Sequence, residues 1–170
     1  MASFTQAEID ALIIYPKEVT EAPSRSLRKE GAHLRNDSKF VATDKTKGIF
    51  AVFIRNSIDF PENFSVGLVY NANDGRPEIK LLRCNGKHGV YNKGTGFDPS
   101  HPHWDFHIHR ATEEALESGA AAEKNATATT EFASLEEAVQ YFVKAVNLDS
   151  KDVVKHFRVN SQANLDFGGD

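Results

Sequence analysis

The sequence lacks the residues and runs that mark secreted and membrane proteins. It contains one cysteine, Cys84, among 170 residues, so no internal disulfide can form and nothing points to an oxidising compartment. No apolar run approaches the roughly 18 residues of a membrane-spanning helix. The start, MASFTQAEID, has neither the basic nor the apolar region of a signal peptide. We therefore expect a cytoplasmic protein with no membrane partner.

The chain as a whole also lacks an excess of positive charge. The net charge is −4, whereas proteins that bind duplex nucleic acid tightly usually carry a strongly basic stripe. The charge is unevenly spread, because residues 76–110 hold six basic side chains against three acidic ones. This local excess is a mild indication of an anionic ligand, although ordinary scatter of surface charge would also produce it.

The length favours one domain, which we place at residues 1–160. Within it, residues 117–131 are low in complexity and lack bulky apolar side chains, which predicts a flexible insertion. Residues 161–170 are expected to form a frayed tail.

The apolar pattern predicts an α+β fold. Thr5 and Glu8 have the spacing of a capping box and begin a short helix that Pro16 ends, and Ser134 and Glu137 begin the clearest helix of the chain, over 134–148. Between the helices lie alternating or continuous apolar runs, at 39–43, 48–56, 63–71 and 78–84, with a returning arm at 87–92. We therefore expect an antiparallel sheet of five or six strands with an N-terminal helix and a C-terminal helix packed on it.

Histidine is concentrated in one region. Five of the seven histidines lie between residues 88 and 109, four of them in the decapeptide HPHWDFHIHR at 101–110. The end of this segment alternates as a half-buried strand does. Trp104, Phe106 and Ile108 are expected to face the core, and they leave Asp105, His107 and His109 on an exposed face.

One interpretation of this pattern is a divalent metal site, with zinc as an example. Residues two apart on a strand lie about 6.5 Å apart on one face, close enough for His107 and His109 to share an ion. His103 and Asp105 are the next candidate ligands, and His88 and His101 also lie near in sequence.

A second interpretation is acid–base catalysis without a metal. Imidazole titrates near neutrality, so His107 and His109 would act as acid and base while Arg83 holds an anion. Lys87 and Arg110 add positive charge, and His88 opposes Arg83 if Asn85-Gly86 forms a two-residue hairpin turn. The third interpretation is a solvated strand face without chemistry. Cys84 is expected to be a small buried residue.

Three segments together resemble an uncharacterised family of small bacterial and archaeal proteins: LLRCNGKHGVYN, PHWDFHIH and SLEEAVQYFVKAVNL. The family has a glycine–histidine turn, a His-x-His strand after a proline and a closing helix, and the similarity covers about residues 78–148. It implies that the two histidine motifs form one site and marks matching positions at Arg83, His88, Asn92, His107 and His109. It implies no particular chemistry, and the insertion at 117–131 departs from its compact pattern.

These observations leave two functions open. The first is hydrolysis or binding of a phosphate-bearing ligand, such as RNA or a nucleotide, with His107, His109 and Arg83 as catalytic residues. The ligand would contact His88, Lys87, Asn92 and Arg110. The second is a non-catalytic module that binds a protein partner in a toxin–antitoxin, phage or defence system.

Overall fold

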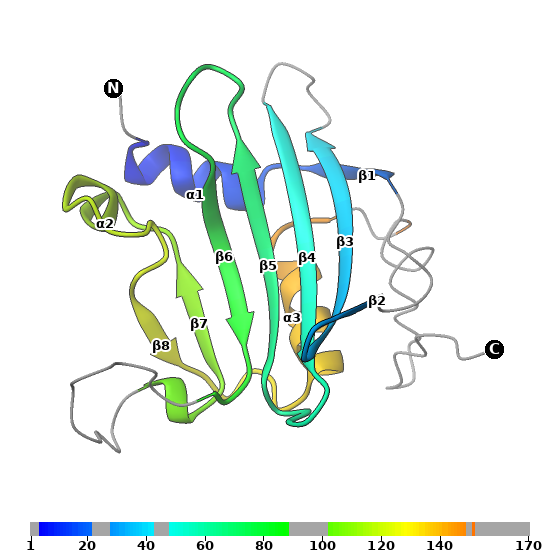
Figure 1. Ribbon diagram of the computed structural model, residues 1–170. Coiled ribbons are helices and arrows are strands. Elements are labelled where there is room, and N and C mark those ends of the chain that lie inside the picture. The colour runs from blue at the N-terminus through cyan, green and yellow to red at the C-terminus, as the bar shows by residue number, and fades with distance from the viewer. Residues whose placement is uncertain (1–3, 22–27, 43–47, 89–101, 149–150, 152–170) are drawn as a thin grey trace.

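In the computed structural model the chain forms one antiparallel sheet with its main helices on one face (Figure 1). The structure describes residues 4–21, 28–42, 48–88, 102–148 and 151. Its helices are α1 (Gln6–Ile14), α2 (Glu113–Glu117) and α3 (Leu135–Ala145), with a 3₁₀ turn, η2 (Pro102–Trp104). Its strands are β1 (Lys17–Glu21), β2 (Arg28–Glu30), β3 (His33–Ala42), β4 (Ile49–Ser57), β5 (Phe64–Asn71), β6 (Ile79–Asn85), β7 (His107–Arg110) and β8 (Ala126–Ala128).

The strand order confirms the predicted α+β class. The sheet runs β1-β3-β4-β5-β6-β7-β8, with β2 paired to β3, and each pair is antiparallel. Five of the expected strands correspond to β3–β7, and the arm expected at 87–92 is not among the described strands. The short strands β1, β2 and β8 bring the described total to eight.

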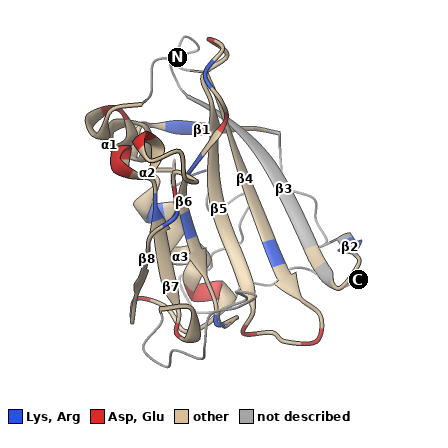
Figure 2. Cartoon of the chain, turned by 60° about the vertical axis from the view of Figure 1, so that its left-hand side comes forward, with Lys and Arg blue, Asp and Glu red and all other residues tan. Residues whose placement is uncertain are grey.

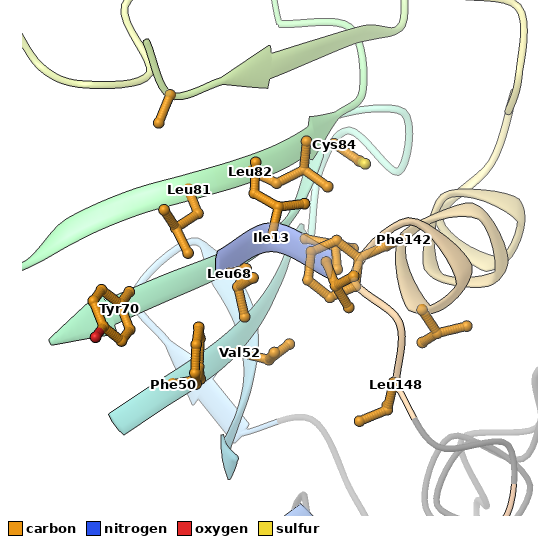
Figure 3. Packing of buried hydrophobic residues seen from close by; sticks show 14 of the residues in the cluster. Ile13, Phe50, Val52, Leu68, Tyr70, Leu81, Leu82, Cys84, Phe142 and Leu148 are labelled. Atoms are coloured by element: carbon orange, nitrogen blue, oxygen red, sulfur yellow. The ribbon is translucent and has the colours of Figure 1, made fainter. Parts of the chain in front are cut away.

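The core lies between the sheet and the two longer helices. Alternate residues of β5, from Phe64 to Tyr70, are buried as the sequence predicts, and they meet Ile13 of α1 and Phe142 of α3 (Figure 3). Cys84 is fully buried in this core, and burial raises the pKa of its thiol to about 12. It is therefore a packing residue, as predicted, and not a nucleophile.

Both predicted helix starts are present. The Thr5 side chain accepts from the Glu8 backbone N–H while the Glu8 carboxylate accepts from the Thr5 N–H, which completes the capping box of α1. At α3, the Ser134 hydroxyl accepts from the Glu137 N–H. The Glu137 carboxylate instead accepts from the N–H of Ala133, one residue before the cap.

A buried lysine joins the ends of the two helices. The Lys17 ammonium, 1% exposed, donates to the carbonyls of Ile13, Tyr15 and Val146 at 2.9, 2.6 and 3.0 Å. It also lies 4.7 Å from the centre of the Phe50 ring. The carbonyls at helix C-termini lack partners within the helix, so Lys17 satisfies groups from α1 and α3 together. Burial lowers its pKa to about 7.

The structure corrects the predicted turn at Asn85-Gly86. β6 ends at Asn85 and pairs with β5 and β7, and residues 87 and 88 belong to no strand. The rest of the predicted returning arm, 89–92, lies outside the described residues. The Gly86 N–H donates to the Phe64 carbonyl at 3.0 Å, and a Cβ at Gly86 would overlap the Glu62 carbonyl oxygen. This glycine is required by close backbone approach. The same pairing overturns the prediction that His88 opposes Arg83, because Arg83 faces His109 instead.

Residues 117–131, expected to be a flexible insertion, contribute to the sheet. β8 pairs with β7, and both Ala122 and Glu123 are buried. The composition is poor in bulky residues because this edge needs only small side chains and backbone hydrogen bonds. The tail at 161–170 lies outside the described residues.

Candidate metal centre

β7 places its histidines on the sheet face opposite the core. Ile108 packs against the hydrophobic cluster, and the alternation turns His107 and His109 to the other side. The predicted alternation is confirmed, but the predicted exposure of this face is wrong. His107 is 0% exposed and His109 is 3% exposed.

Two other segments cover these rings. His103 of η2 lies with its ring centre 4.7 Å from that of His107 and 5.4 Å from that of His109. The ring of His88 is 4.7 Å from His103 and 5.0 Å from His107. The backbone N–H of His88 also donates to the backbone carbonyl of His103 at 3.2 Å, which holds the two segments together. Four histidines thus form one cluster, and His101 lies outside the described residues.

Three members of the cluster have the arrangement of a metal site. One nitrogen from each of His88, His103 and His107 lies within 4.8 Å of the other two. His107 is buried, His103 is half-buried and His88 is exposed, so the group is closed on the sheet side and open toward solvent. Zinc binds imidazole nitrogen at about 2.0–2.1 Å. Nitrogens that share one zinc ion therefore lie closer together than this limit, and His88 and His103, which lie outside the strands, can adjust to an ion.

The backbone fixes the protonation of the two buried rings. His107 Nδ1 is 2.9 Å from the Asp105 carbonyl, and His109 Nδ1 is 2.8 Å from the Glu123 carbonyl. A carbonyl only accepts, so each Nδ1 carries the proton and each Nε2 presents a lone pair. Metal-binding histidines are commonly held in this way by a carbonyl on the other nitrogen.

The Nε2 lone pairs of His107 and His109 have different surroundings. Asn85 Nδ2 donates to His107 Nε2 at 3.2 Å, and Ser65 Oγ donates to Asn85 Oδ1 at 2.7 Å. Among the described residues, His109 Nε2 is buried and has no hydrogen-bond partner. A buried acceptor without a partner is costly, and such sites are frequently explained by an ion or ligand.

The electrostatics favour neutral rings. Burial is the main cause that lowers the pKa of His107 to about 3 and that of His109 to about 4, and the Arg83 guanidinium adds to the shift at His109. Both rings are therefore neutral at pH 7. A neutral imidazole is the form that binds a metal, whereas acid–base catalysis needs one protonated partner.

Arg83 lies directly beside the cluster, as predicted. It pairs with His109 across β6 and β7, is half-buried, and its Nε has no partner among the described side chains and backbone. Burial lowers the pKa of this guanidinium, and the Glu123 carboxylate opposes that shift. Glu123 itself is buried and pairs with Lys80 at 3.1 Å.

Other predicted residues lie elsewhere. The Arg110 guanidinium bonds Asp10 at 3.0 Å, because residue 110 faces the side of β7 opposite to His109. Lys87 Nζ is 3.5 Å from a Glu62 carboxylate oxygen and 4.9 Å from the centre of the Phe106 ring. Asp105 is exposed and serves His107 through its carbonyl, and its carboxylate is not part of the metal group found among the described residues. Asn92 lies outside the described residues.

Trp104 does not continue the inward face of the strand. It belongs to η2, where the backbone turns before β7 begins, and it is 38% exposed. Phe106 is half-buried and packs against the core, as predicted.

Two residues of the site were not predicted. Asn85 was assigned to a turn, and the only sequence signal for its role is its position two residues after Arg83 on one strand. Glu123 lies in the low-complexity segment and contributes its carbonyl, for which no side-chain pattern exists.

The chain matches no protein-family model, no curated protein and no solved structure. The resemblance noted above therefore stays an expectation. Across the part of the chain that the structure describes, no helix has the length and apolar character needed to cross a bilayer.

Proposed function

We propose that this protein binds one divalent transition-metal ion through His88, His103 and His107 and acts with it on a phosphate-bearing substrate. The observation that carries the proposal is the convergence of these three imidazoles, one nitrogen from each within 4.8 Å of the others. Support comes from the Asp105 carbonyl, which leaves His107 Nε2 deprotonated.

The chemistry of the ligands limits which metal ions fit the site. An all-imidazole set suits zinc, copper, nickel or iron, whereas magnesium and calcium prefer oxygen. Three protein ligands leave coordination positions for water and substrate, and the exposed side of His88 provides the opening. A metal of this class polarises a phosphoryl oxygen and lowers the pKa of bound water, which makes hydrolysis the reaction that fits.

Two neighbouring groups have roles in such a reaction. The Arg83 guanidinium, with its unpartnered Nε, would hold a phosphate oxygen as a charge-assisted donor. The buried Nε2 of His109 would accept a hydrogen bond from a water molecule on the cluster side. Neither role requires a protonated histidine, which agrees with the lowered pKa values.

The metal content of purified protein tests the first part of the proposal, that the three histidines bind a metal ion. Untagged protein is analysed by inductively coupled plasma mass spectrometry as wild type, His103→Ala and His33→Ala. His103 is half-buried, so its replacement disturbs the fold less than that of His107. His33 is the matched control, because it lies on β3, four positions from β7 in the strand order.

We expect close to one metal ion per chain in wild type and His33→Ala, and at least tenfold less in His103→Ala. Equal metal in all three proteins, or none after incubation of wild type with zinc, overturns the site. Hydrolysis of RNA and of nucleotides is then measured with metal-loaded protein. If metal binds but neither is hydrolysed, the catalytic half is wrong, and a non-catalytic module remains as the function.

A further inference from the structure

Two rows of residues run across β4, β5, β6 and β7 and end at the histidine cluster. In the first row, consecutive cross-strand partners are Phe53, Gly67, Arg83 and His109. In the second, they are Arg55, Ser65, Asn85 and His107. Cross-strand partners share a face, so both rows lie on the side of the sheet away from α1 and α3.

The two rows form a continuous surface from the histidine cluster on β7 to Phe53 and Arg55 on β4. Neighbouring strands are 4.7–4.9 Å apart, so β4 and β7, three steps apart, are separated by about 14 Å. Neither α1 nor α3 covers this face, since both lie on the other one (Figure 1), and η2 covers only its β7 end. The distance exceeds the size of a single phosphate group, so the surface suits an extended ligand.

An aromatic ring, that of Phe53, covers Gly67 at the far end of the first row. A Cβ at Gly67 would collide with the ring of Phe53, so that ring lies over the glycine on the neighbouring strand. Phe53 is only half-buried. The Arg55 guanidinium carbon lies over the same ring, 5.1 Å from its centre, and Arg55 is exposed. A base can stack on this ring once the exposed arginine side chain turns aside to a phosphate.

The charge of the two rows between β4 and β7 is positive. Over these strands the rows contain two arginines and no acidic residue, and on β3 the next partners are Asp37 beside Phe53 and Arg35 beside Arg55. Burial is the main cause that lowers the pKa of Arg83, and the positive charge of Arg55 adds a smaller lowering, so the two guanidinium groups repel each other across the face. The nearby Glu123 carboxylate is paired with Lys80. In Figure 2, acidic residues colour α1, α2 and α3, whereas β4 and β6 carry basic bands.

We infer that these rows bind a single-stranded polynucleotide, with one base stacked on Phe53 and phosphates held by Arg55 and Arg83. The strand then leads to the histidine cluster. This inference deepens the proposed function, on which its catalytic meaning rests, by naming a polymer and not a mononucleotide as substrate. Duplex binding does not fit, because the base must be unstacked to reach Phe53 and the chain is acidic overall. An acidic peptide would use the arginines but not the ring.

Binding is measured separately from cleavage. The fluorescence anisotropy of labelled 12-nucleotide oligouridine and oligothymidine is followed with full-length protein in EDTA, so that metal-dependent cleavage does not occur. The variants are Phe53→Leu, which keeps apolar cover over Gly67 but removes the ring, and Arg55→Ala. The matched controls are Phe60→Leu and Arg110→Ala, because Phe60 is 70% exposed and the Arg110 side chain is 51% exposed, away from the rows.

We expect Phe53→Leu to weaken binding of either oligonucleotide by roughly fivefold or more, since stacking of one base is worth that much. Arg55→Ala should weaken it and reduce the slope of log K against log salt by about 0.7, the value for one phosphate contact on a single strand. The controls should bind as wild type does. If Arg55 had only a structural role, Arg55→Ala would leave the slope of log K against log salt unchanged.

Three results would overturn the inference: unchanged binding by both variants, an equal loss in the controls, or displacement of the oligonucleotide by polyglutamate of the same charge. His103→Ala separates this inference from the proposed function. It should lose metal yet bind oligonucleotide like wild type. If wild type holds metal and hydrolyses nucleotides while Phe53→Leu and Arg55→Ala behave as wild type, the inference fails and the proposed function stands.

Discussion

Asn85 and His107 are direct partners across β6 and β7, and Asn85 Nδ2 donates to His107 Nε2 at 3.2 Å. In the proposed metal site this nitrogen would also be the ligand, because His107 Nδ1 is held by the Asp105 carbonyl. In the metal-free protein the amide therefore satisfies a buried acceptor that the ion would otherwise occupy. Metal binding at Nε2 must break this hydrogen bond.

Asn85→Ala should consequently affect the two states differently. Without metal, His107 Nε2 loses its donor and Ser65 Oγ loses its acceptor, which should lower the free energy of unfolding by about 1–3 kcal/mol. With zinc, the ion satisfies the imidazole, so the zinc-induced rise in Tm should exceed that of wild type. Thermal unfolding in EDTA and in zinc tests both. The exposed Asn125→Ala is the control, and a zinc shift no larger than wild type contradicts the prediction.

Gly86→Ala tests why a glycine follows Asn85. Since a methyl group there would overlap the Glu62 carbonyl, the chain must move apart, and we expect a loss of about 2 kcal/mol or more in stability. At Gly75 an added methyl meets no atom, and only its φ of 90° is unfavourable, so Gly75→Ala should cost about 1 kcal/mol. Urea unfolding compares the two. A smaller loss at Gly86 than at Gly75 would show that the close approach is not required.

Asn85-Gly86 also shows which parts of the fold and of the site could be predicted from the sequence. The apolar periodicity of β4 and β5 reports which face is buried, so the sheet and its helices could be predicted. An Asn-Gly dipeptide is compatible both with a hairpin turn and with a close backbone approach. Which of the two forms here depends on Glu62, whose carbonyl lies against Gly86 and which is distant in sequence. The alternation of β7 likewise placed His107 and His109 on one face. Their burial depends on His103, His88 and residues near Glu123, which no local pattern connects to that strand.

Lys17→Met should destabilise the protein, because it leaves the carbonyls of Ile13, Tyr15 and Val146 without their donor. We expect a loss of about 2 kcal/mol or more in the free energy of unfolding. Lys124→Met, at an exposed position, should change little. The pH dependence gives a second readout. The folded pKa is lowered to about 7 and the unfolded value is 10.5, so the unfolded chain binds more protons between pH 7 and 9 and stability rises with pH.

That rise should disappear in Lys17→Met, while Lys124→Met should keep it. Urea unfolding at pH 7, 8 and 9 measures the three proteins. If wild type and Lys17→Met have the same dependence on pH, the ammonium does not lose its proton in the folded state over this range.

The buried histidines predict a dependence of the same sign on the acid side, where stability also rises with pH. The folded pKa values of His107 and His109 are lowered to about 3 and about 4, from 6.5 in the unfolded chain. Between pH 6.5 and 4 the unfolded state therefore binds protons that the folded state does not, and stability is lost as the pH falls. The slope should reach roughly 1 kcal/mol per pH unit for each ring.

Urea unfolding of metal-free protein at pH 7, 6 and 5 measures this slope, and His109→Gln should reduce it by about half because one of the two groups is removed. Zinc should steepen the loss in wild type, since protons compete with the ion for the same imidazole nitrogens. Equal stability of the metal-free protein at pH 7 and pH 5 would mean that these rings accept protons while folded. The two imidazoles would then be available as acid and base, and the preference for a metal over metal-free chemistry would lose its electrostatic support.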